Sequence, residues 1–191
     1  MRRDARRLRR LPAQVLIRAR APAVEFFQLV LAVHILAVVL AFGVTFAYPL
    51  FGIVGARMDP RAMPWFHRMQ QVIGRRLINP ALLIVLVAGI YLASHLHQWG
   101  ATYVQWGLAA VVVLGGLEGG FMVPREGRLA DLAERHLAGS PAAGAGASAS
   151  TATATVGAEY TALLKRVGLV GSLMQLIVVV TVFLMATRAG A

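Results

Sequence analysis

Residues 77–117 have the sequence LINPALLIVLVAGIYLASHLHQWGATYVQWGLAAVVVLGGL, which contains no Asp, Glu, Lys or Arg. A membrane-spanning helix needs about 20 consecutive apolar residues, so this stretch is too long for one crossing and long enough for two. Polar residues and a glycine interrupt it at SHLHQWGAT, residues 94–102, and aromatic residues beside such a turn are typical of the membrane–water interface. The stretch therefore predicts two spanning helices, over about 78–96 and 102–123.

Two further stretches lack acidic and basic residues, one over residues 26–56 and the other over 167–187. Their apolar residues run continuously rather than alternating with polar ones, which favours helices over strands. We expect spanning helices at about 25–50 and 167–187 in addition to the first pair. The predicted fold is an all-α, integral membrane four-helix bundle over residues 24–188, preceded by a basic N-terminal tail over residues 1–23.

The composition agrees with a chain surrounded by lipid. Of its 191 residues, 58% are apolar and only 14% are charged, whereas a soluble domain carries about 25% charged residues. The net charge is +11, and the basic residues gather in the tail and in loops beside apolar runs, as residues that contact anionic lipid headgroups do. We therefore expect membrane lipid, and no nucleic acid, as a partner. The absence of cysteine excludes disulfides and thiolate metal sites.

The residues between the third and fourth predicted helices are almost all Ala, Gly, Ser and Thr. Such a low-complexity segment has no apolar face to bury, so we expect a flexible loop over residues 138–158.

The basic residues do not decide which end of the helices faces the cytoplasm. Eight arginines precede residue 21, whereas the loops around 57–76 and 125–166 hold most of the others. Because basic loops tend to face the cytoplasm, the loops favour both termini outside and the tail favours them inside. Two explanations stay open: the tail is a surface segment held at the membrane interface, or translation begins near Val24.

Polar residues inside a membrane are costly, so each one within a predicted span is a candidate for function. These residues are His34, Tyr91, Gln105, Glu118 and Gln175. We expect Glu118 to form an ion pair with Arg75 or Arg76 at the start of the second predicted helix, because a cation would offset the cost of burying the carboxylate. The spacing around His67 and His136 predicts solvated loop residues at both positions.

His34 is the most central of these polar residues, and three roles stay open for it. It can form a hydrogen bond between helices, act as a ligand of haem or a metal, or relay protons. The sequence contains no Ser-His-Asp arrangement, phosphate-binding glycine loop or HExxH motif, so it predicts no catalytic residues and no dedicated metal site.

Two segments carry a resemblance to a known family. They are LAVHILAVVLAFGVTFAYPL, residues 31–50, and FHRMQQVIGRRLINPALLIVLVAGIYL, residues 66–92, followed by a tryptophan-rich turn and a glycine-rich helix. Together they resemble an uncharacterised bacterial family of integral membrane proteins, the domain of unknown function numbered twenty-two sixty-nine, over roughly residues 25–187. The resemblance implies a multi-pass protein of the bacterial inner (plasma) membrane.

A more distant likeness is to the bacterial membrane protoporphyrinogen oxidase and to copper-resistance membrane proteins. They too have a histidine in an early helix and an arginine followed by a proline before the next helix. This likeness implies haem as a cofactor, with His34 as the haem-linked residue and Arg75, Arg76 and Pro80 in the matching basic segment. The oxidase family has a lysine after a tryptophan in a later helix, whereas this chain has WGATYVQWGL, residues 99–108, with Gln105 as the nearest polar residue.

Three functions follow as hypotheses. The chain is a small inner-membrane bundle that binds a ligand or haem, a haem-dependent membrane oxidoreductase that uses His34, or a transporter or ion-handling subunit that uses Glu118 and His34. Four helices are few to enclose a transport path, so a homo-oligomer is also open.

Overall fold

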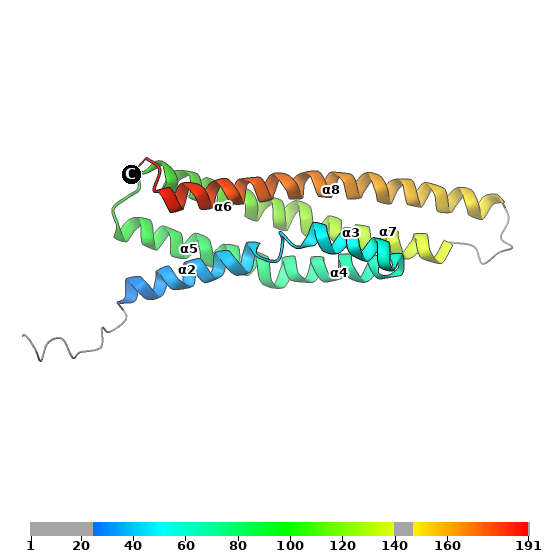
Figure 1. Ribbon diagram of the computed structural model, residues 1–191, viewed down its shortest axis with the longest axis horizontal. Helices are drawn as coiled ribbons and strands as arrows, with labels where there is room; N and C mark the ends of the chain where they lie inside the picture. The colour runs from blue at the N-terminus through cyan, green and yellow to red at the C-terminus, as the bar shows by residue number, and fades with distance from the viewer. Residues whose placement is uncertain (1–24, 140–146, 191) are drawn as a thin grey trace, which may run out of the picture.

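The structure is a computed structural model that describes residues 25–139 and 147–190, with side chains described up to residue 139 and from residue 157 onward. The predicted basic tail, residues 1–23, lies outside the described residues. The described part of the chain consists of helices joined by short turns and contains no strand (Figure 1). The all-α prediction is therefore confirmed for these residues.

The chain runs back and forth along one long axis. The elements in order are α2 (Phe26–Phe42), α3 (Tyr48–Met58), the short η2 (Pro60–Ala62), α4 (Met63–Ile73), the π-helical turn η3 (Gly74–Ile78), α5 (Asn79–His95), α6 (Thr102–Leu117), the π-helical turn η4 (Glu118–Met122), α7 (Val123–Gly139) and α8 (Ala147–Thr187). Helix α2 packs on α5, α4 packs on α7, and α8 packs on both α6 and α7. The start of α2 and the end of α8 lie at the same end of the molecule (Figure 1).

The first predicted helix, 25–50, is interrupted. Helix α2 ends at Phe42, turns follow over residues 43–47, and α3 begins at Tyr48 with Pro49 in its first turn. Pro49 has no N–H to donate to the Thr45 carbonyl, and the Thr45 hydroxyl donates to the Phe42 carbonyl at 2.8 Å. Both features favour a break at this position over a continuous helix.

The other three helices are longer than the predicted 78–96, 102–123 and 167–187. Continuous helix runs over Pro60–His95, Thr102–Gly139 and, in α8, Ala147–Thr187. The charged segments that suggested loops form amphipathic helices instead, because α4 and α7 each bury one apolar face and turn their charges outward. Of the predicted loop 138–158, residues 140–146 lie outside the described part and the residues from Ala147 onward are helical.

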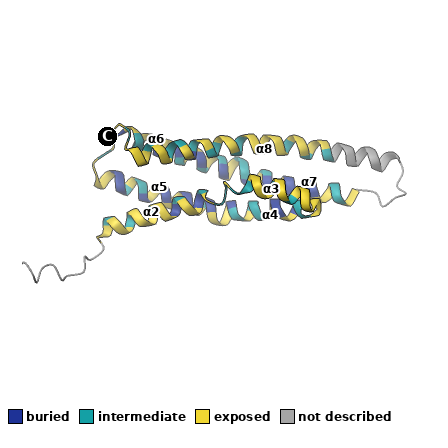
Figure 2. Ribbon diagram, viewed as in Figure 1, coloured by how far each residue is buried: buried dark blue, intermediate teal, exposed yellow. Residues whose placement is uncertain are grey.

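Three of these helices are long and apolar enough to cross a membrane, and α2 is a shorter apolar helix. Large apolar side chains cover their outer faces, including Leu83, Val87, Val112 and Phe183, which are all more than half exposed (Figure 2). We call α2, α5, α6 and residues 167–187 of α8 the apolar half. We call α3, α4, α7 and residues 157–166 of α8 the charged half. The π-helical turns η3 and η4 contact each other where the halves meet.

Candidate functional site

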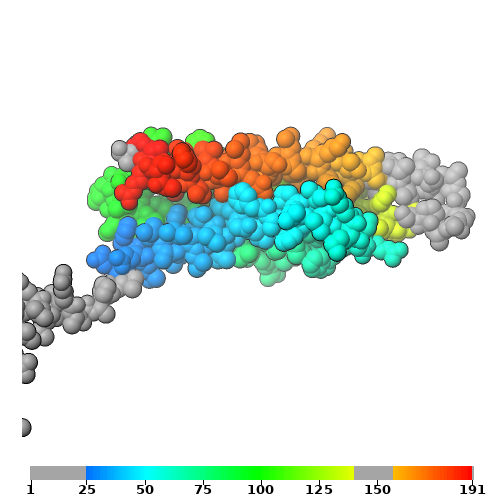
Figure 3. Space-filling view, in the orientation of Figure 1, coloured from blue at the N-terminus to red at the C-terminus, as the bar shows by residue number. Residues whose placement is uncertain are grey.

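A cavity of about 610 Å³ lies where the apolar half meets the charged half, and residues of α3 and α8 both line it. Figure 3 shows the surfaces of these two helices side by side on one face of the molecule. Its volume falls in the range of small-molecule sites, roughly 300–1,000 Å³. Apolar side chains form most of its wall. The polar side chains that line it are Thr45, Tyr48, His67, Gln70, Glu118, Glu126, His136, Tyr160, Ser172 and Gln175.

A buried hydrogen-bonded chain joins three helices beside the cavity. His67 of α4 is only 3% exposed; its Nδ1 lies 2.8 Å from Glu126 Oε2 of α7, and its Nε2 lies 3.0 Å from the Tyr160 hydroxyl of α8. With Glu126 ionised, Nδ1–H donates to the carboxylate, and a neutral imidazole accepts a hydrogen bond from Tyr160 at Nε2. Both ring nitrogens of His67 are therefore engaged.

The local sequence explains why these groups face inward. Pro64 begins α4 and is buried on the same face as His67, three positions later. In α7, Glu126 lies on the face that also buries Leu129, Ala130 and Ala133, at the spacing of successive helical turns. The packing of α4 on α7 then brings the imidazole and the carboxylate together.

Glu118 is the second buried carboxylate of the cavity, and it is 7% exposed. It lies directly over Gly74 of η3, where an added Cβ would be 2.5 Å from Glu118 Oε1. Among the residues that the structure describes, no side chain forms an ion pair with Glu118 and none is within hydrogen-bonding distance of it. A glycine at position 74 is thus needed to admit the carboxylate.

The predicted ion pair of Glu118 with Arg75 or Arg76 is wrong. The residue of η3 that faces Glu118 is Gly74, and not the arginines that follow it. Both arginine side chains are accordingly exposed.

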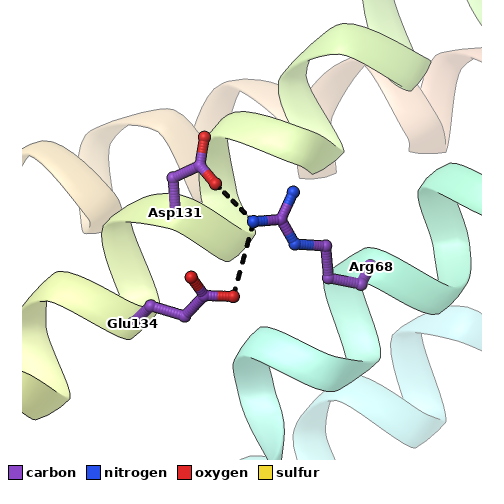
Figure 4. A network of polar contacts seen from close by, with 3 residues as sticks. All are labelled: Arg68, Asp131 and Glu134. Carbon is purple, nitrogen blue, oxygen red and sulfur yellow. Dashed lines mark hydrogen bonds and ion pairs between the residues drawn. The ribbon is translucent and has the colours of Figure 1, made fainter.

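The other charged groups nearby are neutralised on the outer surface. Arg68 Nη2 donates to Asp131 Oδ1 at 2.6 Å and lies 3.4 Å from Glu134 Oε1 (Figure 4). Arg128 pairs with Glu159. These pairs join α4 to α7 and α7 to α8 without reaching the cavity, so they do not compensate the Glu118 carboxylate.

Three buried polar atoms of the cavity lining have no hydrogen-bond partner among the described residues. They are the Tyr48 hydroxyl, Gln70 Oε1 and His136 Nδ1. A buried polar atom without a partner costs about 1–3 kcal/mol, so such atoms are expected to bind water or a ligand. Burial raises the pKa of the Tyr48 hydroxyl, and the Glu118 and Glu126 carboxylates raise it further.

Gln175, a residue predicted from the sequence, lies on the cavity wall and connects α8 to the break after α2. Its Nε2 donates to the Thr45 carbonyl at 2.9 Å. Pro49 cannot donate to this carbonyl, the Tyr48 N–H donates to it at 3.3 Å, and the Gln175 side chain adds a second hydrogen bond from another helix.

The remaining predicted residues lie outside the cavity lining. Tyr91 packs edge-to-face on Phe26, with ring centroids 5.4 Å apart, and stacks on His95. Gln105 Nε2 donates to the Trp99 carbonyl at 3.3 Å, at the turn between α5 and α6. The cavity therefore brings together Glu118 and Gln175, and not the other three predicted residues.

His34, the predicted haem-linked residue, lies outside the cavity, and its Nδ1 has no hydrogen-bond partner among the described residues. Its ring lies against α5, where an added Cβ at Gly89 would be 3.4 Å from His34 Cε1. Of the histidines that do line the cavity, His67 has both nitrogens engaged. Across residues 25–139 and 157–190, no group of three or more His, Cys, Asp or Glu side chains could hold a metal ion.

Sequence reasoning missed His67, Glu126 and Tyr160. His67 was expected to be a solvated loop residue, and it is buried because α4 is a packed helix rather than a loop. One signal was present: Glu126 falls on the apolar face of an amphipathic segment, where a carboxylate needs a partner.

Comparison with known proteins adds nothing to this description, since no family model matches the chain and neither a curated protein nor a solved structure is detectably similar to it. The resemblance to a bacterial membrane family stays a prediction.

Proposed function

We propose that this chain is a multi-pass protein of the bacterial inner membrane, folded as a four-helix bundle, that binds a small amphipathic molecule in the cavity between its two halves. The observation that carries the proposal is the cavity itself, about 610 Å³ with an apolar wall and several unpaired polar groups. Of the functions left open by the sequence, this cavity favours ligand binding, because His34 lies outside it.

The dimensions of the apolar half support its place in the bilayer. Helix α5 has 17 residues, or about 25 Å at 1.5 Å per residue, and residues 167–187 of α8 extend about 31 Å. Both lengths are close to the hydrocarbon thickness of about 30 Å. Basic residues follow at the boundary with the charged half, where lipid headgroups would meet them: Arg75, Arg76, Arg125, Lys165 and Arg166. The charged half then projects from one side of the membrane.

The position of the cavity suits an amphipathic ligand. Its polar groups belong mainly to the charged half, whereas Ala41, Leu82 and Val178 extend its wall into the apolar half. A molecule with an apolar body and a polar head would concentrate at this depth of the bilayer. The ligand's body would then contact the apolar wall, and its head would satisfy the unpaired polar atoms.

The glycines of the bundle offer a direct test. Gly168 lines the cavity, and an added Cβ there meets nothing within 4 Å, so we expect Gly168→Phe to place its ring in the space of the cavity. Gly116 also meets nothing within 4 Å but lies outside the lining, so Gly116→Phe is the matched control. The probes are three compounds with related aromatic bodies: tetraphenylphosphonium, triphenylphosphine oxide and tetraphenylborate.

Equilibrium dialysis of the protein in dodecyl maltoside micelles measures binding of each probe. We expect at least one probe to bind the unmodified chain and Gly116→Phe, and to bind Gly168→Phe at least about tenfold more weakly. If all three proteins take up every probe equally, the probes report only the micelle and the cavity is not a binding site. Recovery of the chain as a folded monomer in the supernatant of a detergent-free lysate would contradict the membrane assignment.

A further inference from the structure

We infer that the cavity selects a hydrophobic organic monocation and that Glu118 supplies its counter-charge. This inference rests on the proposed function, because it names the class of ligand for the same cavity. It is carried by the charges that face the cavity, by the absence of a resident cation among the described side chains, and by the chemistry of the unpaired atoms.

Two carboxylates face the cavity, and one imidazole faces them. Glu126 has His67 at 2.8 Å, whereas Glu118 has no charged or hydrogen-bonding partner within the described part of the chain. A carboxylate that is ionised and buried without a partner is strongly unfavourable, and a bound cation removes that cost. Glu118 is therefore the side chain most in need of a positively charged ligand.

The basic side chains around the cavity do not meet this need. Arg68 and Arg128 pair with surface carboxylates, and the Arg125 guanidinium lies over the Phe121 ring at 3.6 Å. Lys165 and Arg166, like the two arginines of η3, are exposed. An ionised Glu118 would therefore have to find its counter-charge in a bound molecule.

The unpaired atoms can also accept hydrogen bonds from a cation that carries donors, although the inference needs only the positive charge. Gln70 Oε1 is an acceptor only, and the Tyr48 hydroxyl and His136 Nδ1 can both accept. A protonated amine could donate to such groups, whereas an anion would face two carboxylates and the acceptor atom of Gln70. The apolar wall, with residues such as Phe42 and Leu82, accounts for the hydrophobic body of the ligand.

The three probes named above test this selectivity, because tetraphenylphosphonium is a cation, triphenylphosphine oxide is neutral and tetraphenylborate is an anion. We expect the cation to bind at least about tenfold more tightly than the neutral compound, in line with a charge interaction in a partly buried site. In Glu118→Gln, the affinity for the cation should fall at least about tenfold, and that for the neutral compound should stay within about threefold. Glu159→Gln removes an equal charge outside the cavity and should change neither affinity.

The inference is overturned if Glu118→Gln keeps the affinity for tetraphenylphosphonium, or if Glu159→Gln loses as much. If Glu118→Gln does not fold, the affinities of the unmodified chain for the three probes test the inference by themselves. The inference is then overturned if the neutral compound or the anion binds as tightly as the cation or more tightly. Gly168→Phe separates the two claims. If Gly168→Phe abolishes binding but the unmodified chain does not prefer the cation, the proposed function stands and the inferred charge selectivity is wrong. If Gly168→Phe does not change binding, the proposed function and the inferred selectivity are both wrong.

Discussion

The buried pair of His67 and Glu126 allows a quantitative test of the charged half. Their side chains are 4% and 7% exposed and their atoms are 2.8 Å apart, so solvent does little to screen the interaction. His67→Phe fills the imidazole's space but leaves the carboxylate buried without a partner. Removing one member of a buried pair costs about 3–5 kcal/mol, and we expect a loss of unfolding free energy in that range.

The double variant should be more stable than His67→Phe alone. Replacing both members by apolar side chains, as in His67→Phe with Glu126→Met, removes the unpaired charge and should recover at least about 1 kcal/mol relative to His67→Phe alone. Tyr160→Phe removes only the hydroxyl bond at 3.0 Å and should cost about 1–2 kcal/mol. Reversible unfolding in mixed micelles of dodecyl maltoside and SDS, followed by circular dichroism, measures all four free energies.

Independent behaviour of the two residues would refute this reasoning. Distant sites add within about 0.5 kcal/mol, so a double variant whose loss equals the sum of the single losses within that margin would show that His67 and Glu126 do not interact. The single variant Glu126→Met completes the cycle.

Three further predictions concern the surface, the bilayer and the contact between η3 and η4. Arg68→Ala removes the ion pairs of Figure 4, and because all three side chains are about half exposed we expect a loss below about 1 kcal/mol in the same unfolding assay. Leu83→Arg, on the outer face of α5, should reduce the membrane-inserted yield, since Arg at the bilayer centre costs about 2.5–3.5 kcal/mol. Trp65→Arg, equally exposed on α4 of the charged half, should leave that yield unchanged. Gly74→Ala should cost about 1–3 kcal/mol because its Cβ would be 2.5 Å from a buried carboxylate oxygen, whereas Gly120→Ala, with nothing within 4 Å, should change stability by less than about 1 kcal/mol.

Each of these expectations has a contradicting result. A loss above 2 kcal/mol for Arg68→Ala, on the order of a buried charge pair, would make the surface pair structural. Equal membrane-inserted yields for Leu83→Arg and Trp65→Arg would contradict the proposal that the apolar half lies in the bilayer. A neutral Gly74→Ala would mean that η3 and η4 are not in close contact.

The sequence predicted where helices exist better than where they end. Runs without charge located α5, α6 and the second part of α8, because a membrane helix is defined by composition over a fixed length. We expected a loop at α4 and a short surface or helix-extending segment at residues 128–137 of α7, and only their helical periodicity indicates that they pack. The break after Phe42 depends on Pro49 and on a tertiary bond from Gln175, and the second of these is invisible to local reasoning.

The candidate site was predictable only in part. Glu118 and Gln175 were candidates as polar residues in apolar runs, and both line the cavity. The chain of His67, Glu126 and Tyr160 joins residues 59 and 93 positions apart, so no local pattern could reveal it. The partner predicted for Glu118 was wrong because depth along a helix was considered without the direction in which each side chain points.

The π-helical turns η3 and η4 determine how an insertion or deletion changes the direction of side chains in the helices on either side of them. A π-turn holds one residue more than the α-helical turn it replaces, so it resets the angular phase of everything beyond it. Deleting one residue from η3 would turn α4 by about 100° relative to α5, moving His67 out of register with α7 while the exposed apolar face of α5 kept its own phase. An insertion or deletion at either turn would therefore change which side chains face the interior of the charged half without altering the exposed apolar faces of the other helices.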